Sequence, residues 1–240
     1  MTSDMERSAT RRQVLGLGCL TVGGLMLGCA GRPRSTAALP APVWPASSDP
    51  YVPGPRPSGS PVEAPVPVVG AMGVERRSAW ASEPPRVLLA DRMRRIQRIT
   101  IHHDAMPSSG MLARGDAADR LRAIQRAHFE LGWADIGYHY AIDPAGRVWE
   151  GRPTNLQGAH VRDQNERNLG IVVLGNFMHE QPTPAAVAAL RSFVGAQALR
   201  YRVPPARVRT HRELAATQCP GTWLQRAVDN GRRSGVPGLA

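Results

Sequence analysis

The prolines of this chain are concentrated in one stretch, which limits the part of the chain that folds. Half of the 22 prolines lie between Pro33 and Pro67, among Ser, Ala and Gly. A segment of this composition does not bury enough apolar surface to offset the entropy lost on ordering its backbone. We therefore interpret residues 30–72 as a disordered tether. We expect one folded domain at 73–230 and a flexible tail at 231–240.

The first 29 residues have the pattern of an export signal. Arg11 and Arg12 precede an apolar, Gly-rich run at 14–28 that is shorter than the ~20 residues needed to span a bilayer. The segment around the two arginines resembles a twin-arginine signal, and residues 25–29 (LMLGC) resemble a bacterial lipobox. We expect an exported protein of the periplasm or cell envelope, lipidated at Cys29 and bound to the membrane only through that lipid. Ordinary cleavage to a soluble secreted protein is the alternative.

The charge of the chain is strongly positive but dispersed. The formal net charge is +11, and all 30 basic residues are arginine. Because these arginines are scattered and not gathered in a stripe with aromatic residues, we expect no nucleic-acid partner. A basic surface also suits an anionic polymer such as a cell wall.

Five short runs rich in β-branched or apolar residues predict strands. They lie at 98–103, 136–142, 147–151, 169–175 and 206–210. Residues 169–175 are apolar on both faces, so we place this strand at the centre of a covered sheet. Within 136–142, the two-residue period of a strand puts Tyr138 and Tyr140 on one face and His139 on the other.

Apolar residues at three- and four-residue spacing predict three helices. The first runs over 116–131 with Asp116 as its N-cap, and the second runs over 183–201. The third runs over 222–230 and begins with a capping-box pattern at 222–225. Strands and helices in this order predict a single domain of the α/β (mixed α+β) class, with a central mixed sheet covered by helices on both faces.

Histidines and one cysteine in the folding part suggest a zinc site. His102 and His103 end one predicted strand, His211 follows another, and Cys219 precedes the last helix. Zn²⁺ binds imidazole and thiolate at about 2.0–2.3 Å, and three protein ligands leave a fourth position for water. The position of Cys219 before a helix predicts a lowered thiol pKa and hence a thiolate.

These signals leave alternatives open when they are taken one at a time. His102 and His103 point to opposite faces of a strand, so we expect only one of them to ligate, and spacing alone does not choose. The seven-residue gap between His211 and Cys219 is common by chance. An isolated cysteine is more often a small buried apolar residue than a ligand.

Many short motifs, however, follow one another in the order seen in peptidoglycan recognition proteins and phage-lysozyme-type amidases. They are RSAWA at 77–81, IHH at 101–103, IQRAH at 124–128, GWADIGYHY at 132–140, EGR at 150–152, GAH at 158–160, NLGI at 168–171, GNF at 175–177, HRE at 211–213 and TQCPG at 217–221. Over about 74–228 the chain thus resembles the zinc N-acetylmuramoyl-L-alanine amidases of type 2. The resemblance implies the peptidoglycan-recognition/amidase type 2 fold.

The resemblance also implies roles for individual residues. It gives His102, His211 and Cys219 as zinc ligands. It gives Tyr138 as the catalytic phenol, and Thr217 occupies a position held by Thr or Lys in active relatives. Binding-only members of the family typically lose the cysteine, so its presence here favours an enzyme.

For the substrate, the resemblance implies contacts to glycan or stem peptide from the loop at 154–167. We expect these contacts from His160 and Asn165, with Arg152 as a further substrate-binding residue. No Asp or Glu is placed at the site by a motif, so the proton shuttle is unassigned. We expect Glu213 to have a structural role in preference to that of a general base.

The chemistry that these residues imply is hydrolysis of the amide between N-acetylmuramic acid and L-alanine in peptidoglycan. Zn²⁺ polarises the amide carbonyl and lowers the pKa of its bound water, and Tyr138 donates a hydrogen bond to the oxyanion. We expect a monomer. The alternative function is a non-catalytic peptidoglycan-binding protein.

Overall fold

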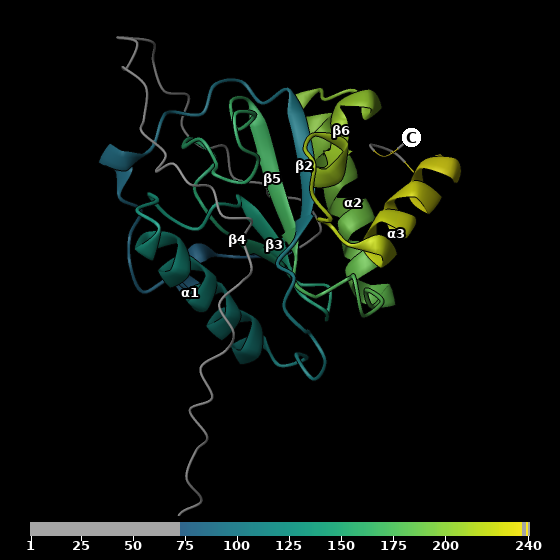
Figure 1. Ribbon diagram of the computed structural model, residues 1–240, viewed down its shortest axis with the longest axis horizontal. Helices are drawn as coiled ribbons and strands as arrows, with labels where there is room; N and C mark the ends of the chain where they lie inside the picture. Colours follow the sequence, from purple (N-terminus) through teal and green to yellow (C-terminus); the bar gives the residue numbers. More distant parts are fainter. Residues whose placement is uncertain (1–72, 237–238, 240) are drawn as a thin grey trace, which may run out of the picture. The chain divides into compact units, whose positions relative to one another are not determined.

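The computed structural model describes residues 73–236 and Leu239, so the predictions for the export signal, Cys29 and the tether lie outside the described residues. The described part contains a six-stranded sheet in the order β1-β4-β3-β5-β2-β6 (Figure 1). These strands are β1 (Val74–Glu75), β4 (Val148–Glu150), β3 (Tyr140–Ile142), β5 (Asn168–Val173), β2 (Arg98–His103) and β6 (Val208–Thr210). Neighbouring strands run parallel except for the antiparallel pair β3–β4. This confirms the mixed sheet and the central place of β5.

The strand register brings the ends of β2 and β6 together. β2 pairs with β5 along its whole length, up to His103 opposite Val173. On its other edge β2 pairs with β6, where Ile101 lies opposite Thr210. Because these strands are parallel, their carboxyl ends lie at one edge of the sheet, which is where open α/β sheets bind ligands. Residues that end β2 or follow β6 are therefore neighbours.

Helices cover both faces of the sheet, as predicted. α1 (Arg114–Glu130) packs on one face, and α2 (Pro184–Tyr201) and α3 (Thr222–Arg233) lie on the other (Figure 1). Within β5, Val172 joins the core under α1, whereas Ile171 and Val173 join the core under α2 and α3. Burial on both faces explains why this strand is apolar throughout. None of the helices in the described part is both long and apolar enough to cross a bilayer.

Two helix boundaries differ from those predicted. α1 begins at Arg114, so Asp116 is not the N-cap but the third helical residue, and its carboxylate accepts the Ala113 N–H at 3.1 Å. A carboxylate at this position satisfies one of the donors left free at a helix start, which is why the sequence pattern misplaces the cap. By contrast, α2 begins within one residue of its predicted start, and Thr183 is its N-cap, whose side chain accepts the Ala186 N–H at 3.0 Å.

The C-terminal boundary is also wrong. α3 starts at Thr222 after Gly221 and continues through Gly231 to Arg233, so the predicted tail begins inside a helix. Gly231 is buried because Leu239, only 2% exposed, packs against it. A glycine signals a helix end only where its conformation is needed there, whereas this one provides space for a packed side chain.

The predicted strand at 136–142 is shorter than expected. β3 begins at Tyr140, and Tyr138 packs in the α1 core while Tyr140 packs in the opposite core, so the prediction that they share a face is wrong. The break in the alternation falls at His139, whose Nδ1 accepts the Gly170 N–H at 2.9 Å.

Candidate active site

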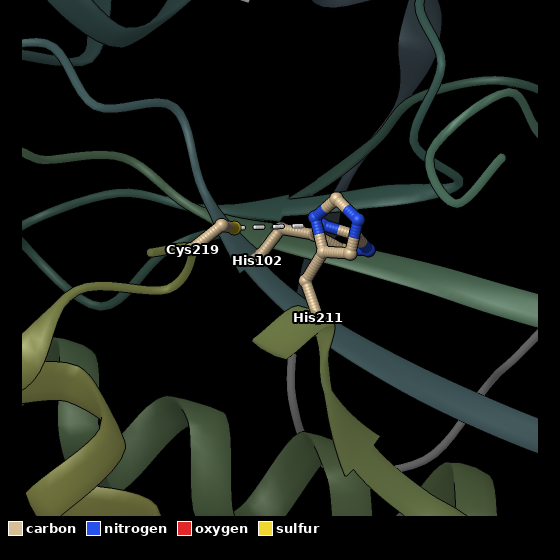
Figure 2. Close-up of side chains that lie close together, drawn as sticks. All are labelled: His102, His211 and Cys219. Atoms are coloured by element: carbon tan, nitrogen blue, oxygen red, sulfur yellow. Dashed lines mark hydrogen bonds between the residues drawn. The ribbon is translucent and has the colours of Figure 1, made fainter. Parts of the chain in front are cut away.

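Three predicted ligands converge at the carboxyl edge of the sheet (Figure 2). His102 comes from β2, His211 opens the short 3-10 helix η4 (His211–Glu213) directly after β6, and Cys219 lies in the loop before α3. One potential ligand atom from each lies within 4.8 Å of the others. Within the described residues this is the one group of three or more His, Cys, Asp or Glu side chains with metal-binding geometry.

His103 lies on the other side of the strand and is excluded from this group. Its ring stacks on Phe177, with 6.1 Å between ring centroids, and its Nδ1 accepts the Phe177 N–H at 3.3 Å. The structure therefore makes the choice between His102 and His103 that spacing could not make.

The donor set fits zinc. A tetrahedral ion with sulfur at 2.3 Å and nitrogen at 2.0–2.1 Å holds these two atoms about 3.6 Å apart. The Cys219 Sγ lies 3.7 Å from the His102 Nδ1, the pair joined by the dashed line in Figure 2. Two imidazoles and one thiolate are ligands that zinc prefers, and three protein ligands leave a position for water or substrate.

Burial keeps the two imidazoles neutral. It lowers the pKa of His211 to about 4. It lowers the pKa of His102 well below its ordinary value, with His160 and His211 adding to the effect. A neutral imidazole has a lone pair to offer, so both rings are ready to bind a metal near neutral pH.

The prediction that Cys219 is a thiolate is wrong for the metal-free site. Burial raises the pKa of the thiol to about 12, although the His103 N–H and the nearby Arg212 both favour the thiolate. Desolvation outweighs the helix start at this partly buried cysteine. Deprotonation therefore requires the charge of a bound metal, which removes the proton of a coordinating thiol outright.

The segment that carries His211 is anchored by Glu213. The Glu213 carboxylate accepts the Thr210 N–H at 2.7 Å across η4 and binds the Arg232 guanidinium of α3 at 2.6 Å. Partial burial would raise the pKa of Glu213, but the hydrogen bonds from Arg232 and the Thr210 N–H outweigh it and lower the pKa, so Glu213 is held as an anion. Its two bonds lock η4 between β6 and α3, which supports the structural role expected of it.

Thr217 contacts the ligand loop directly. Its half-buried hydroxyl oxygen accepts the Cys219 N–H at 3.2 Å. The Arg212 N–H donates to the Cys219 carbonyl at 2.8 Å, so the backbone of the cysteine is held from both ends. The hydroxyl hydrogen of Thr217 is not used in the bond to Cys219 and is available for a further acceptor.

Tyr138 lies beside the ligands, inside the α1 core. It is 3% exposed, and its ring centroid lies 5.3 Å from that of His102. Burial raises the pKa of Tyr138 well above 10, and negative charge at Cys219 and Asp104 would raise it further. The phenol therefore remains protonated and is a hydrogen-bond donor at any physiological pH.

The three residues expected to bind substrate have other contacts. Arg152 is 3% exposed, and its guanidinium donates to the carbonyls of Ile136, Gln157 and Asp135 at 2.6–2.9 Å. Arg152 is thus part of a structural clamp and not an exposed cation, and its substrate-binding role stays a prediction. The motif EGR shows only that an arginine follows a strand, and gives no sign of its burial.

Asn165 and His160 belong to one loop structure. Asn165 Oδ1 accepts the N–H groups of His160 and Val161, both at 2.8 Å. The His160 side chain is 8% exposed and points into the protein, with its Nδ1 3.0 Å from the His102 Nε2. The structure thus brings His160 to the metal ligands and not to an open substrate surface.

Comparison with known proteins decides the family. The profile of the N-acetylmuramoyl-L-alanine amidase family (Amidase_2) matches residues 92–222, which is more than half of the chain. This chain belongs to the N-acetylmuramoyl-L-alanine amidase family. The match spans the candidate ligands and Tyr138, and it confirms the resemblance drawn from the motifs.

Relatives of this amidase-family chain include enzymes and recognition proteins by name. An N-acetylmuramoyl-L-alanine amidase of Sus scrofa is 33% identical over 159 residues, which cover 65% of this chain and 27% of the relative. Peptidoglycan-recognition protein SC2 of Drosophila simulans is 35% identical over 124 residues, covering 51% of this chain and 66% of the relative. The chain therefore spans only about a quarter of the length of the mammalian relative.

Solved structures confirm the fold of the amidase domain. Drosophila PGRP-LB has a TM-score of 0.61 at 27% identity, covering 71% of this chain and 97% of that one. A mutant of PGRP-LB in complex with tracheal cytotoxin has a TM-score of 0.57 at 28% identity, with 62% and 89% covered. The amidase LysC of Clostridium intestinale, at 23% identity and a TM-score of 0.55, shares the fold.

The motifs did not reveal one polar pair of this amidase domain, Asp104 and Arg120. Asp104 follows His103 and is 1% exposed, and it accepts the Gly175 N–H at 2.7 Å and the Arg120 guanidinium at 2.8 Å. Burial raises the pKa of Asp104 to about 6 against the opposing effect of Arg120. The sequence does show an acidic residue, Asp104, at the end of a predicted strand. It does not show that Arg120, in the helix α1, is the partner of this residue, because a local pattern does not report contacts between distant segments.

Proposed function

We propose that this chain is a zinc-dependent hydrolase that cleaves the amide between N-acetylmuramic acid and L-alanine of bacterial peptidoglycan. The observation that carries the proposal is the complete ligand set of His102, His211 and Cys219 beside the buried phenol of Tyr138. A recognition module needs neither a zinc donor set nor a protonated phenol next to it. The amidase relatives and the cytotoxin-bound structural neighbour support peptidoglycan as the substrate class.

When bound, zinc would polarise the amide carbonyl and lower the pKa of its bound water toward 7. The protein supplies the rest of the site. His102, His211 and Cys219 would hold the ion. Tyr138 stays protonated and donates to the oxyanion that develops on the former carbonyl oxygen. Thr217 fixes Cys219 through the N–H that its oxygen accepts, and its own O–H provides a second donor.

The test uses purified sacculi and the zinc-loaded protein. We expect release of stem peptides with a new free amino group on L-alanine, detected by amine labelling and mass spectrometry. Cys219→Ala should lose both zinc and release. The matched control is His103→Asn, which keeps an acceptor for the Phe177 N–H on the opposite face and should retain zinc and activity. Binding to sacculi without release, by a protein that holds no zinc, would favour the non-catalytic alternative.

We also propose that the chain is exported and anchored through a lipid on Cys29, which would leave the domain on a long tether. The support is the sequence alone: paired arginines, a short apolar run and the LMLGC pattern. In a bacterial host that lipidates such signals, the mature protein should partition into the detergent phase. Cys29→Ser should move it to the aqueous phase, whereas equal partitioning of the two proteins would contradict the lipid anchor.

A further inference from the structure

His160 links a candidate metal ligand to the main chain of the central strand. Its Nδ1 lies 3.0 Å from the Nε2 of His102, and its Nε2 lies 3.1 Å from the carbonyl oxygen of Asn168, the first residue of β5. Both nitrogens of the His160 ring are therefore occupied inside the protein, and neither is left for a glycan or stem peptide.

The direction of these hydrogen bonds follows from what each group can donate. A main-chain carbonyl only accepts, so the Nε2 of His160 carries the hydrogen. One nitrogen of the close His102–His160 pair must donate and the other accept, and a neutral His160 ring with its hydrogen on Nε2 has only a lone pair at Nδ1. The Nδ1 of His160 is then an acceptor, and the hydrogen of His102 lies on its Nε2.

This assignment determines which atom of His102 is free. With its hydrogen on Nε2, the ring has its lone pair on Nδ1. The Nδ1 is the atom that lies 3.7 Å from the Cys219 Sγ. The chain of hydrogen bonds from Asn168 through His160 thus directs the lone pair of His102 toward the other two ligands.

Neighbouring residues on several sides hold the His160 ring in place. Gly158 and Gly170 border it so closely that a Cβ on either glycine would collide with the ring. The edge of His139 approaches it, with 5.8 Å between ring centroids. The N–H of His160 is held by Asn165. An imidazole fixed in this way loses little entropy when it orients a neighbour.

We infer that His160 is a positioning residue that fixes the tautomer and ring orientation of His102, so that Nδ1 is the metal-binding atom. The inference rests on the metal site of the proposed function. Ligating histidines commonly donate their other N–H to such a partner, and loss of the partner typically weakens metal binding 10–100-fold. His160 therefore acts through His102 and replaces the substrate contact expected from the sequence.

The experiment measures metal binding by the full-length protein and by variants at position 160. His160→Phe keeps a ring between the two glycines but removes the acceptor. We expect its zinc affinity, measured by chelator competition, to fall by about 10–100-fold, and the absorption spectrum of bound Co²⁺ to shift. His160→Asn places an amide oxygen near the Nδ1 position and should recover much of the affinity.

Two further variants separate positioning from folding. His160→Gln reaches toward the Asn168 carbonyl but has no acceptor near His102, so it should bind zinc more weakly than His160→Asn even if His160→Phe fails to fold. His128→Asn alters another buried imidazole, which is not one of the candidate ligands. The Nδ1 of His128 accepts the Gly137 N–H, and the bond is 2.9 Å long. This variant should lose stability but keep the zinc affinity and the Co²⁺ spectrum.

Two outcomes would overturn the inference or its basis. Equal zinc affinity in the wild-type protein and in the Phe, Gln and Asn variants would overturn the positioning role while leaving the proposed function intact. A wild-type protein that binds neither zinc nor Co²⁺ would overturn the metal site itself, and with it the proposed function.

Discussion

Tyr138 differs from the other residues of the site because its expected role needs no metal contact. The ring lies against His102 in the α1 core, and burial keeps the hydroxyl protonated. A preorganised donor in a site shielded from water stabilises a developing oxyanion more strongly than the same donor in solvent. The phenol and the metal ligands should therefore be separable by mutation.

We predict that Tyr138→Phe keeps zinc but loses turnover. The variant removes one hydroxyl without changing the packing of the ring, so zinc affinity should match the wild type. The turnover number on muropeptides should fall by about 10²–10³-fold, as expected for the loss of one oxyanion donor. Tyr140→Phe is the matched control, because Tyr140 packs in the opposite core. Full activity in Tyr138→Phe would remove the phenol from the mechanism.

At the scale of single residues, the sequence predicts ligand types better than side-chain roles. The motifs identify His102, His211 and Cys219, because ligation needs particular side chains and these are visible in the sequence. The contact between His160 and His102 joins residues that are 58 positions apart. The burial of Arg152 depends on how the fold encloses its side chain. A local pattern contains neither kind of information.

At the scale of elements, the side chain of His139, directly before β3, links this strand to β5 and to the loop at Leu156. His139 accepts the Gly170 N–H at its Nδ1 and lies with its Nε2 3.1 Å from the Leu156 carbonyl, so the neutral ring bridges two main-chain groups. The bonds require one donor and one acceptor nitrogen, and a protonated ring has no acceptor.

We predict that acid destabilises the domain partly through His139. Burial lowers its pKa to about 3, whereas an unfolded histidine titrates near 6.5. As pH falls below 6.5 the unfolded chain binds the proton first. The contribution of His139 to the free energy of unfolding is thus intact above this pH and declines below it by about 1 kcal/mol per pH unit, until pH approaches 3.

Urea denaturation at pH 7, 6 and 5 would measure this dependence. His139→Asn can still accept the Gly170 N–H through its amide oxygen but cannot bind a proton. The variant should be less stable than the wild type at pH 7 and should have a shallower pH dependence. The same slope in both proteins would assign the acid sensitivity to other groups.

Periodicity predicts elements where packing is regular and fails where a side chain replaces a main-chain partner. β2 matches its predicted bounds at both ends. β5 overlaps its predicted run, because burial on both faces makes it apolar, but it begins one residue earlier, at Asn168. The start of β3 is displaced past His139, whose ring accepts a main-chain N–H of β5. The end of α3 is displaced because Leu239, outside the helix, packs on Gly231. Both errors arise from contacts that no local pattern encodes.

At the scale of the whole described domain, the candidate ligands join segments that are distant in sequence. His102 belongs to β2, whereas His211 and Cys219 belong to the segment between β6 and α3. The backbone of that segment is already held by Glu213 and Arg232 and by the bond from the His103 N–H to the Cys219 Sγ. A metal at this point would add a further link between the central sheet and the C-terminal helix.

We therefore predict that removing zinc lowers the melting temperature without unfolding the domain. An ion that binds only the folded chain stabilises it by about 2.7 kcal/mol when its free concentration is a hundred times its Kd. For a domain of this size, chelation should thus lower the Tm by roughly 5–10 °C. Cys219→Ala should melt at the same temperature with or without chelator, because it holds no ion to lose. If chelation strips zinc from the wild type and leaves its Tm unchanged, the ion does not tie the C-terminal segment to β2, and the Glu213 and Cys219 hydrogen bonds alone hold the two together.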